Sequence, residues 1–151
     1  MAKIVEDFII ENMKEEDLDE ILRIERESFS DPWRKEFFLQ DLCKEYALPV
    51  VVRIGGRLAG YTCLWKIEDE IQIANIAIAK EYRGRGVAKR LLEWIVEQSL
   101  KQNFKYITLD VRESNSVALG LYRKYGFEEI VRRKNYYCNP VEDAIVMEKK
   151  L

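Results

Sequence analysis

Two glycines and two arginines stand together in the segment at 82–88 (YRGRGVA), directly before the helix-patterned run KRLLEWIVEQSL. The first N–H groups of a helix lack partners within the helix, and the helix dipole favours negative charge there. A glycine-rich turn at that place therefore suits a phosphate group, to which Arg83 and Arg85 would add charge-assisted hydrogen bonds. The segment matches neither Walker A nor a complete GxGxxG. A solvated turn and a nucleic-acid patch are the alternative interpretations.

The sequence contains no histidine. This excludes Ser-His-Asp and Cys-His catalysis and any zinc site that uses histidine. A proton acceptor must therefore be a carboxylate, Lys, Tyr, Cys or a water molecule. The three cysteines, Cys43, Cys63 and Cys138, follow no metal-binding or redox spacing. We expect reduced thiols, a cytoplasmic protein and no metal site.

Composition is typical of a single globular domain. The 151 residues are 48% hydrophobic and 34% charged, which is enough apolar material for a core. Lys plus Arg number 25 against 27 for Asp plus Glu, and this balance argues against a dedicated nucleic-acid binder. No apolar run approaches the roughly 18 residues of a membrane span, and MAKIVEDFII is a poor signal peptide. We expect one domain over residues 1–151, with neither nucleic acid nor membrane as a direct partner.

Hydrophobic periodicity predicts the elements of the first half. Residues Ile4–Glu11 form a strand pattern, and Arg34–Cys43 suits a short helix after the SDPW break. Apolar runs on both sides of Gly55-Gly56 predict a hairpin, which IQIANIAIA extends as a third strand. Between the first strand and SDPW, a helix is indicated by side chains at helical spacing: Leu18, Ile21, Leu22, Glu25 and Phe29.

The second half alternates helices and strands. Lys105–Val111 is a strand pattern, Ser114 or Asn115 can cap a helix that Gly126 ends, and FEEIVRRKNYY and DAIVMEKKL read as closing strands. The order β-α-α-β-β-β-α-β-α-β-β predicts a mixed α/β (α+β) domain with a largely antiparallel sheet of about seven strands and about four helices. The helix after the YRGRG loop presents one apolar face: Val87, Ala88, Leu91, Leu92, Ile95 and Ser99.

Three motifs in this order resemble a known superfamily. RGRGVA at 83–88 matches R/Q-x-x-G-x-G/A, NIAI stands in the strand before it, and LDVRESNSVALGLYRKYGFEEI contains N-x-x-A-x-x-L-Y-x-x-x-G-F. Together they resemble the GNAT superfamily of acetyl-CoA-dependent N-acetyltransferases. FSDPW and RRKNYYCNPVEDAIVM are further similar to the protein N-terminal acetyltransferases of the RimI type and their archaeal relatives. The resemblance covers nearly the whole chain.

The resemblance implies a fold and a way of binding acetyl-CoA. In this superfamily the fourth and fifth strands splay apart, so that acetyl-CoA enters from one side and the amine from the other. It further implies that Ile76, Ala77 and Ile78 lend backbone groups to the pantetheine arm and the thioester carbonyl, and that Asn115 contacts the cofactor. The pyrophosphate would be held by the loop and the start of the next helix: Arg83, Gly84, Arg85, Gly86, Val87, Ala88 and Lys89.

Tyr122 matches the superfamily's general acid. In these enzymes the amine attacks the thioester directly, without an acyl-enzyme, and the tyrosine protonates the departing thiolate of CoA. A phenol can do this only if it is well positioned, because its pKa near 10 exceeds that of a thiol near 8.5. The alternative interpretation is core packing, since Tyr122 shares a helix face with Ala118 and Tyr125.

Asp110 stands where the RimI-type enzymes have a glutamate base, twelve residues before Tyr122. Its side chain is one methylene shorter, so proton removal could pass through a water molecule. A solvated strand carboxylate is the alternative interpretation of Asp110, and other acids could take the role of base: Glu113, Glu68 and Glu70.

The substrate implied by the resemblance is the α-amine of a protein N-terminus, with Ala or Ser first, on a small-subunit ribosomal protein. Trp33, Tyr136 and Tyr137 would shape the peptide groove, and Glu70 would attract the cationic N-terminus. An α-amine has a pKa near 7.7–8.0, so a weak base suffices for it, whereas a lysine amine near 10.4 is almost wholly charged at neutral pH. Acetylation of a small amine or a lysine, and a non-catalytic acyl-CoA-binding module, are the alternatives.

Overall fold

The computed structural model describes residues 7–151. The helices are α1 (Leu18–Ser28), α2 (Lys35–Cys43), α3 (Val87–Lys101) and α4 (Ser116–Lys124), with 3-10 turns at Glu15–Asp17 and Lys80–Tyr82. The strands are β1 (Phe8–Asn12), β2 (Ala47–Ile54), β3 (Arg57–Ile67), β4 (Glu70–Ile78), β5 (Tyr106–Arg112), β6 (Glu128–Tyr137) and β7 (Glu142–Lys150). The predicted order of elements is confirmed. Residues 4–6 of the predicted first strand lie outside the described residues.

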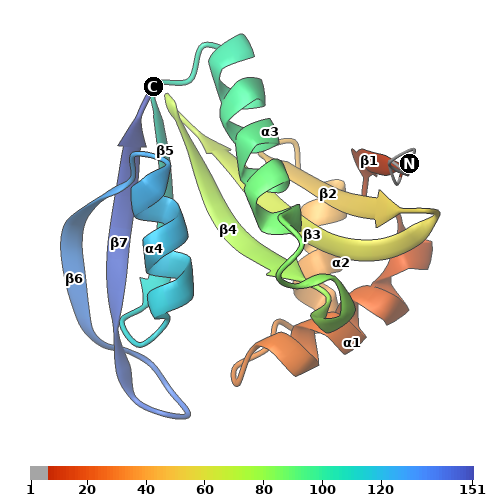
Figure 1. Cartoon of the computed structure of the whole chain (residues 1–151), viewed down its shortest axis with the longest axis horizontal. Coiled ribbons are helices and arrows are strands. Elements are labelled where there is room, and N and C mark those ends of the chain that lie inside the picture. The colour runs from red at the N-terminus through yellow and green to blue at the C-terminus, as the bar shows by residue number, and fades with distance from the viewer. Residues whose placement is uncertain (1–6) are drawn as a thin grey trace, which may run out of the picture.

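The strands form a single seven-stranded sheet in the order β1-β2-β3-β4-β5-β7-β6. Every neighbouring pair is antiparallel except β4 and β5, which are parallel. Figure 1 shows the sheet in two parts, with β1 to β4 on one side and β5, β7 and β6 on the other. The predicted hairpin at Gly55-Gly56 is confirmed, and both residues have positive φ, 58° and 80°, which the tight turn between β2 and β3 requires.

Helices cover both faces of this sheet (Figure 1). On one face, α3 and α4 pack over a core that includes Ile73, Leu91, Leu109 and Met147. On the other face, α1 and α2 pack against a second cluster around Tyr61 and Ala77. The apolar face predicted for α3 is confirmed, because all of its members except the half-buried Ala88 are buried: Val87, Leu91, Leu92, Ile95 and Ser99.

The two parts of the sheet join only along a short parallel ladder. β4 and β5 pair from Glu70 opposite Tyr106 to Ile73 opposite Leu109, although both strands continue beyond this point. Directly after Ile73, the residue Ala74 has no partner on β3, because Ile73 pairs with Leu64 and Asn75 with Cys63. Such a bulge bends a strand and changes which face the following side chains occupy. β4 therefore turns away from β5, as Figure 1 shows.

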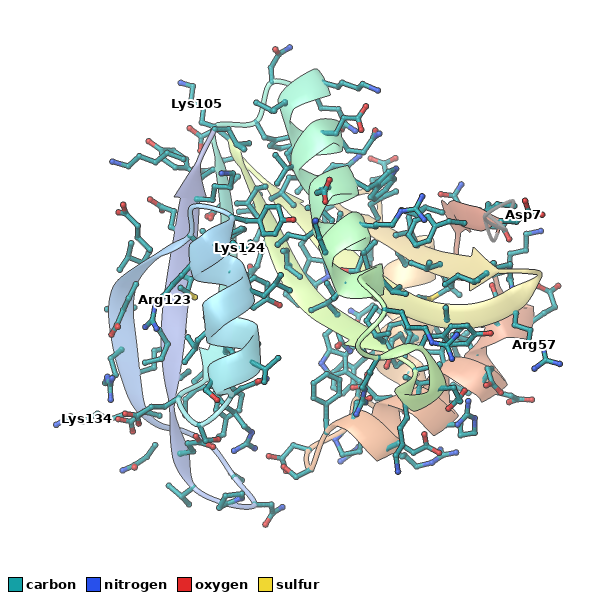
Figure 2. The ribbon with its side chains drawn as sticks, in the orientation of Figure 1. Asp7, Arg57, Lys105, Arg123, Lys124 and Lys134 are labelled. Carbon is teal, nitrogen blue, oxygen red and sulfur yellow. The ribbon has the colours of Figure 1, made fainter. Side chains whose placement is uncertain are left out.

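Many charged side chains are exposed, whereas three carboxylates within residues 7–151 are buried: Asp17, Glu25 and Asp41. Figure 2 labels six exposed ones, of which Asp7, Arg57, Lys105 and Lys134 lie at the edge of the view and Arg123 and Lys124 lie on α4. The described residues contain no helix with the length and apolar character to cross a membrane. The three cysteines are unpaired in the structure, with Cys63 buried and Cys43 and Cys138 exposed.

Candidate active site

A cavity of about 450 Å³ opens where β4 and β5 separate. Its walls are the end of α1 with the loop at 28–33, the middle of β4, the end of β5, the start of α4 and the hairpin between β6 and β7. Residues far apart in the sequence thus meet at one place. Six residues predicted from the sequence line this cavity: Trp33, Ile76, Asp110, Asn115, Tyr122 and Tyr137.

Tyr122 belongs both to the core and to the cavity wall. Its side chain is 7% exposed and its ring packs against Phe127, with 5.6 Å between the ring centroids. Burial raises the pKa of Tyr122 to about 12. The phenol is therefore protonated at neutral pH and can donate a hydrogen bond or a proton into the cavity.

Asp110 lies half-buried on β5 and lines the same cavity. Burial raises the pKa of this carboxyl group, and the positive charge of Arg133 partly opposes that shift. Tyr137 lines the same cavity, and burial together with the charge of Asp110 raises the pKa of Tyr137 to about 12. A half-buried carboxylate on a cavity wall can accept a proton more readily than a fully solvated one, because its conjugate acid is weaker.

The glycine-rich loop leads from β4 to the start of α3. Gly84 and Gly86 have φ of 76° and 79°, and a Cβ added at either one would meet no atom within 4 Å. The first α-helical hydrogen bond runs from Arg90 N to Gly86 O at 3.1 Å, so the preceding N–H groups at 84–89 need other acceptors. The loop is thus an open cradle of N–H groups at a helix N-terminus, which suits a phosphate.

The two arginines of the loop have different surroundings. The Arg83 guanidinium donates to Ile78 O and to Ser28 Oγ, both at 3.0 Å, so it ties the loop to β4 and to the end of α1. Arg85 is exposed and lies 5.6 Å from the ring centroid of Tyr82. Anion binding by this loop would therefore depend on backbone N–H groups, with Arg85 and the exposed Lys89 as the nearby mobile charges.

The part of β4 after Ile73 has an open edge on the side of β5. Its segment at 76–78 is paired with β3, and the ladder to β5 has already ended. The side chains of Ile76 and Ile78 pack towards the α3 side, whereas Ala77 is buried against the α1 side. An open strand edge can pair with an extended ligand through its backbone groups.

Two other predicted residues, Glu70 and Tyr136, do not line the cavity, and Asn115 on its wall also has a structural role. Glu70 is not brought to the cavity, because it pairs with Tyr106 at the end where β4 and β5 are still joined. Tyr136 is 49% exposed on β6, with its ring edge-on to Tyr137 at 5.1 Å. Asn115 caps α4, its Oδ1 accepting from Ala118 N at 3.2 Å, and it lines the cavity at the same time.

Arg112, which was not singled out from the sequence, connects the two loops that close the cavity. Its guanidinium donates to Ser30 Oγ at 3.1 Å and forms an ion pair with Asp31 at 3.3 Å. It also donates to the carbonyls of Cys138 and Pro140 at 2.9 and 3.1 Å. The FSDPW segment and the YYCNPVED segment therefore lie opposite each other, joined through Arg112 and by a direct hydrogen bond from Asn139 Nδ2 to Asp31 Oδ1 at 3.2 Å.

Glu25 was recognised only as a position on the apolar face of α1. The structure places it on the cavity wall, 1% exposed, where it accepts hydrogen bonds from Tyr61, Asn75 and the backbone of Trp33. An acidic residue at an otherwise apolar helical position is the signal that could have revealed it, because a buried carboxylate needs specific partners. Residues 7–151 contain no cluster of His, Cys, Asp or Glu suited to a metal ion.

A splayed pair of parallel strands, a glycine-rich helix start beside one strand and an acid–phenol cavity between them define a class of acyl-transferring enzymes. The acetyltransferase (GNAT) family matches residues 17–127, and the chain belongs to this family.

Two named relatives within the family match about nine-tenths of this chain. A Bacillus subtilis (strain 168) protein named as a candidate [ribosomal protein bS18]-alanine N-acetyltransferase is 41% identical over 139 residues, covering 91% of this chain and 92% of its own. The [ribosomal protein bS18]-alanine N-acetyltransferase of Escherichia coli (strain K12) is 31% identical over 140 residues, covering 91% and 94%.

Solved structures agree with the fold. The crystal structure of the ribosomal-protein-S18-alanine N-acetyltransferase from Escherichia coli has a TM-score of 0.89 at 29% identity, covering 95% of this chain and 94% of that one. Ard1 from Thermoplasma volcanium shares the fold with a TM-score of 0.87 at 24% identity, covering 95% and 97%.

Proposed function

We propose that this chain transfers the acetyl group of acetyl-CoA to the α-amine of a protein N-terminus. The observation that carries the proposal is that Asp110 and Tyr122 line the same cavity, beside the open edge of β4. The named activity of the Bacillus subtilis and Escherichia coli relatives supports a substrate that begins with Ala, with a small-subunit ribosomal protein as the candidate. Ser as the first residue is a further part of the proposal.

Acetyl-CoA fits the residues around the cavity as a co-substrate. The open N–H groups at 84–89 suit its pyrophosphate, and the unpaired edge of β4 at 76–78 suits the amide groups of its pantetheine arm. Both features lie on one continuous segment that runs from β4 into α3. The loops joined by Arg112 form the opposite wall, where a peptide N-terminus would enter.

In the proposed reaction, the neutral amine attacks the thioester carbon, a C–N bond forms and the C–S bond breaks. Asp110 accepts the proton that the amine loses, either directly or through a water molecule, and Tyr122 donates a proton to the sulfur of the leaving CoA. The protein's main contribution is to hold the two reactants in line, which can supply several kcal/mol of the barrier reduction (about 7–11 at best). Proton transfer by the two side chains adds roughly 10²–10⁴-fold.

The cradle can be tested with Gly86→Glu. A carboxylate at the start of α3 would repel a pyrophosphate, so we expect CoA to bind about 10-fold more weakly or worse, measured by calorimetry. Gly56→Glu is the matched control, because Gly56 also has a positive φ and open space around its Cβ but lies in the β2–β3 turn. Equal CoA affinity in both variants would show that the loop is a simple turn and does not bind the pyrophosphate.

Tyr122→Phe tests the general acid. We expect unchanged CoA affinity and a kcat lower by about 10²-fold or more, because the ring still packs but the proton donor is lost. Tyr125→Phe serves as control, since the Tyr125 hydroxyl contacts Glu93 at 3.3 Å on the surface rather than the cavity. Turnover equal to that of the wild type would remove Tyr122 from the mechanism and favour a different proton donor.

Asp110→Asn tests the base through the pH dependence of kcat/KM. A base must be deprotonated to act, so activity should fall as the pH drops through the pKa of Asp110. Because burial raises that pKa, this acidic limb should lie above the ordinary aspartate range near 3.9. We expect the variant to lose this limb and to keep only the one that protonation of the substrate α-amine causes near a pKa of about 7.7–8.0. The loss of kcat should be smaller than in Tyr122→Phe. An unchanged profile would assign proton removal to water or to another carboxylate.

The substrate class can be decided by competition among three amines. One is a peptide that begins with Ala, the second is the same peptide blocked at its N-terminus and carrying an internal lysine, and the third is spermidine. We expect acetylation of the free α-amine to dominate at neutral pH, because a sizeable fraction of it is uncharged there. Preference for the blocked peptide or for spermidine would replace the proposal with a lysine or small-amine acetyltransferase.

A further inference from the structure

Glu25 is the most deeply buried carboxylate on the cavity wall, and the proposed reaction gives it no task. It lies on α1 with 1% of its surface exposed. Its Oε1 accepts hydrogen bonds from the Tyr61 hydroxyl and from Asn75 Nδ2, the latter at 2.9 Å. Its Oε2 accepts from the backbone N–H of Trp33 at 2.9 Å. The three donors come from β3, from β4 and from the segment before α2.

The hydrogen bond to Asn75 fixes β4 at the point where it leaves β5. The bulge at Ala74 reverses the phase of the strand, so Ile71 and Ile73 face α3 before it, whereas Asn75 faces α1 after it. The carbonyl of Asn75 also accepts from Thr62 Oγ1 at 2.7 Å. Asn75 is thus held by its side chain and by its backbone, one residue before the edge proposed to contact the thioester.

The hydrogen bond to Trp33 fixes the opposite wall. Trp33 lines the cavity, and its ring packs against Phe38 and Trp65 at 5.2 and 6.2 Å between centroids. The same segment is tied to Arg112 through Ser30 and Asp31. Without Glu25, the segment would keep its attachment to β5 and lose its direct hydrogen bond to α1.

A buried carboxylate such as Glu25 costs folding free energy, so stability of the fold alone does not explain why it is there. Burial raises its pKa, and within residues 7–151 no Lys or Arg side chain forms an ion pair with it. A buried carboxylate without a cation destabilises a fold unless its hydrogen bonds compensate. All three neighbouring groups donate here, and only a carboxylate accepts from all of them without presenting a donor of its own.

We propose that Glu25 is a positioning residue for acetyl transfer, which sets the separation between the thioester edge of β4 and the amine-side segment that ends at Trp33. The inference rests on the proposed function. Glu25 connects the two walls through a single carboxyl group, so a change there alters the relative placement of the two reactants. A reacting pair misplaced by about 1 Å can lose about 10²-fold in rate.

Glu25→Gln is the sharpest test, because glutamine keeps the size of the side chain while its amide nitrogen opposes one of the three donors. Asp41→Asn is the matched control. Asp41 is also buried, at 4% exposure, accepts from Trp65 Nε1 at 3.0 Å and has its pKa raised by burial, but it does not line the cavity. Both variants would be measured as folded enzyme, quantified by their near-ultraviolet circular dichroism.

For Glu25→Gln we expect kcat to fall about 10- to 100-fold, with CoA affinity within about twofold of the wild type, because the Glu25 carboxylate has no hydrogen-bond partner in the cradle at 84–89. Amide hydrogen exchange at Trp33 should accelerate, since its acceptor is weakened. Asp41→Asn should keep kcat per folded molecule and the protection of the Trp33 amide. This combination separates positioning from a general loss of stability.

Two results would overturn the inference. The first is a Trp33 amide that stays equally protected in Glu25→Gln, which would show that the carboxylate does not hold the segment. The second is an unchanged kcat per folded molecule, or equal losses in both variants. Failure of the proposed function would give a different result, because the wild-type enzyme would then acetylate none of the three amines. The hydrogen-exchange measurement would still decide whether Glu25 holds Trp33.

Discussion

The separation of β4 from β5 after four paired residues is the constraint on which the rest of the structure depends. A continuous ladder would satisfy more backbone groups, and each buried group left without a partner costs free energy. The chain accepts that cost at one place. There the bulge at Ala74 turns β4 aside, and the unpaired edge becomes a surface that a ligand's own amide groups can complete.

The splay persists because each arm of the sheet has its own support. α3 packs on the arm that contains β4, α4 on the arm that contains β5, and the core below them is continuous from Ile73 to Met147. The arms therefore share a packed base and diverge only at the cavity. Arg112 crosses the open end by joining the two loops, so this side of the cavity, where we propose that the peptide enters, is bounded by hydrogen bonds and an ion pair.

Local patterns were sufficient to predict the elements and the loop, because periodicity, turn glycines and helix starts are properties of short segments. The placement of Asp110 and Tyr122 in one cavity followed from family resemblance rather than from local pattern. Glu25 and Arg112 were missed because their partners are distant in the sequence, as Asn75 is from Glu25 and Ser30 is from Arg112. Glu70 was expected near the substrate, but the position at which β4 and β5 stop pairing decides which strand residues line the cavity.

Burial shifts the pKa values of both proposed proton-transfer groups, Tyr122 and Asp110, in the direction that suits the opposite task of each. Desolvation disfavours the charged form of both. For Tyr122 this keeps the phenol protonated, and for Asp110 it strengthens the carboxylate as a base. A buried phenol is a weaker acid in its resting state, so it can donate efficiently only as negative charge develops on the leaving sulfur. In the proposed reaction, proton donation by Tyr122 would therefore accompany C–S cleavage. The fixed geometry of the two walls, rather than the resting acidity of either group, would then be the main determinant of rate.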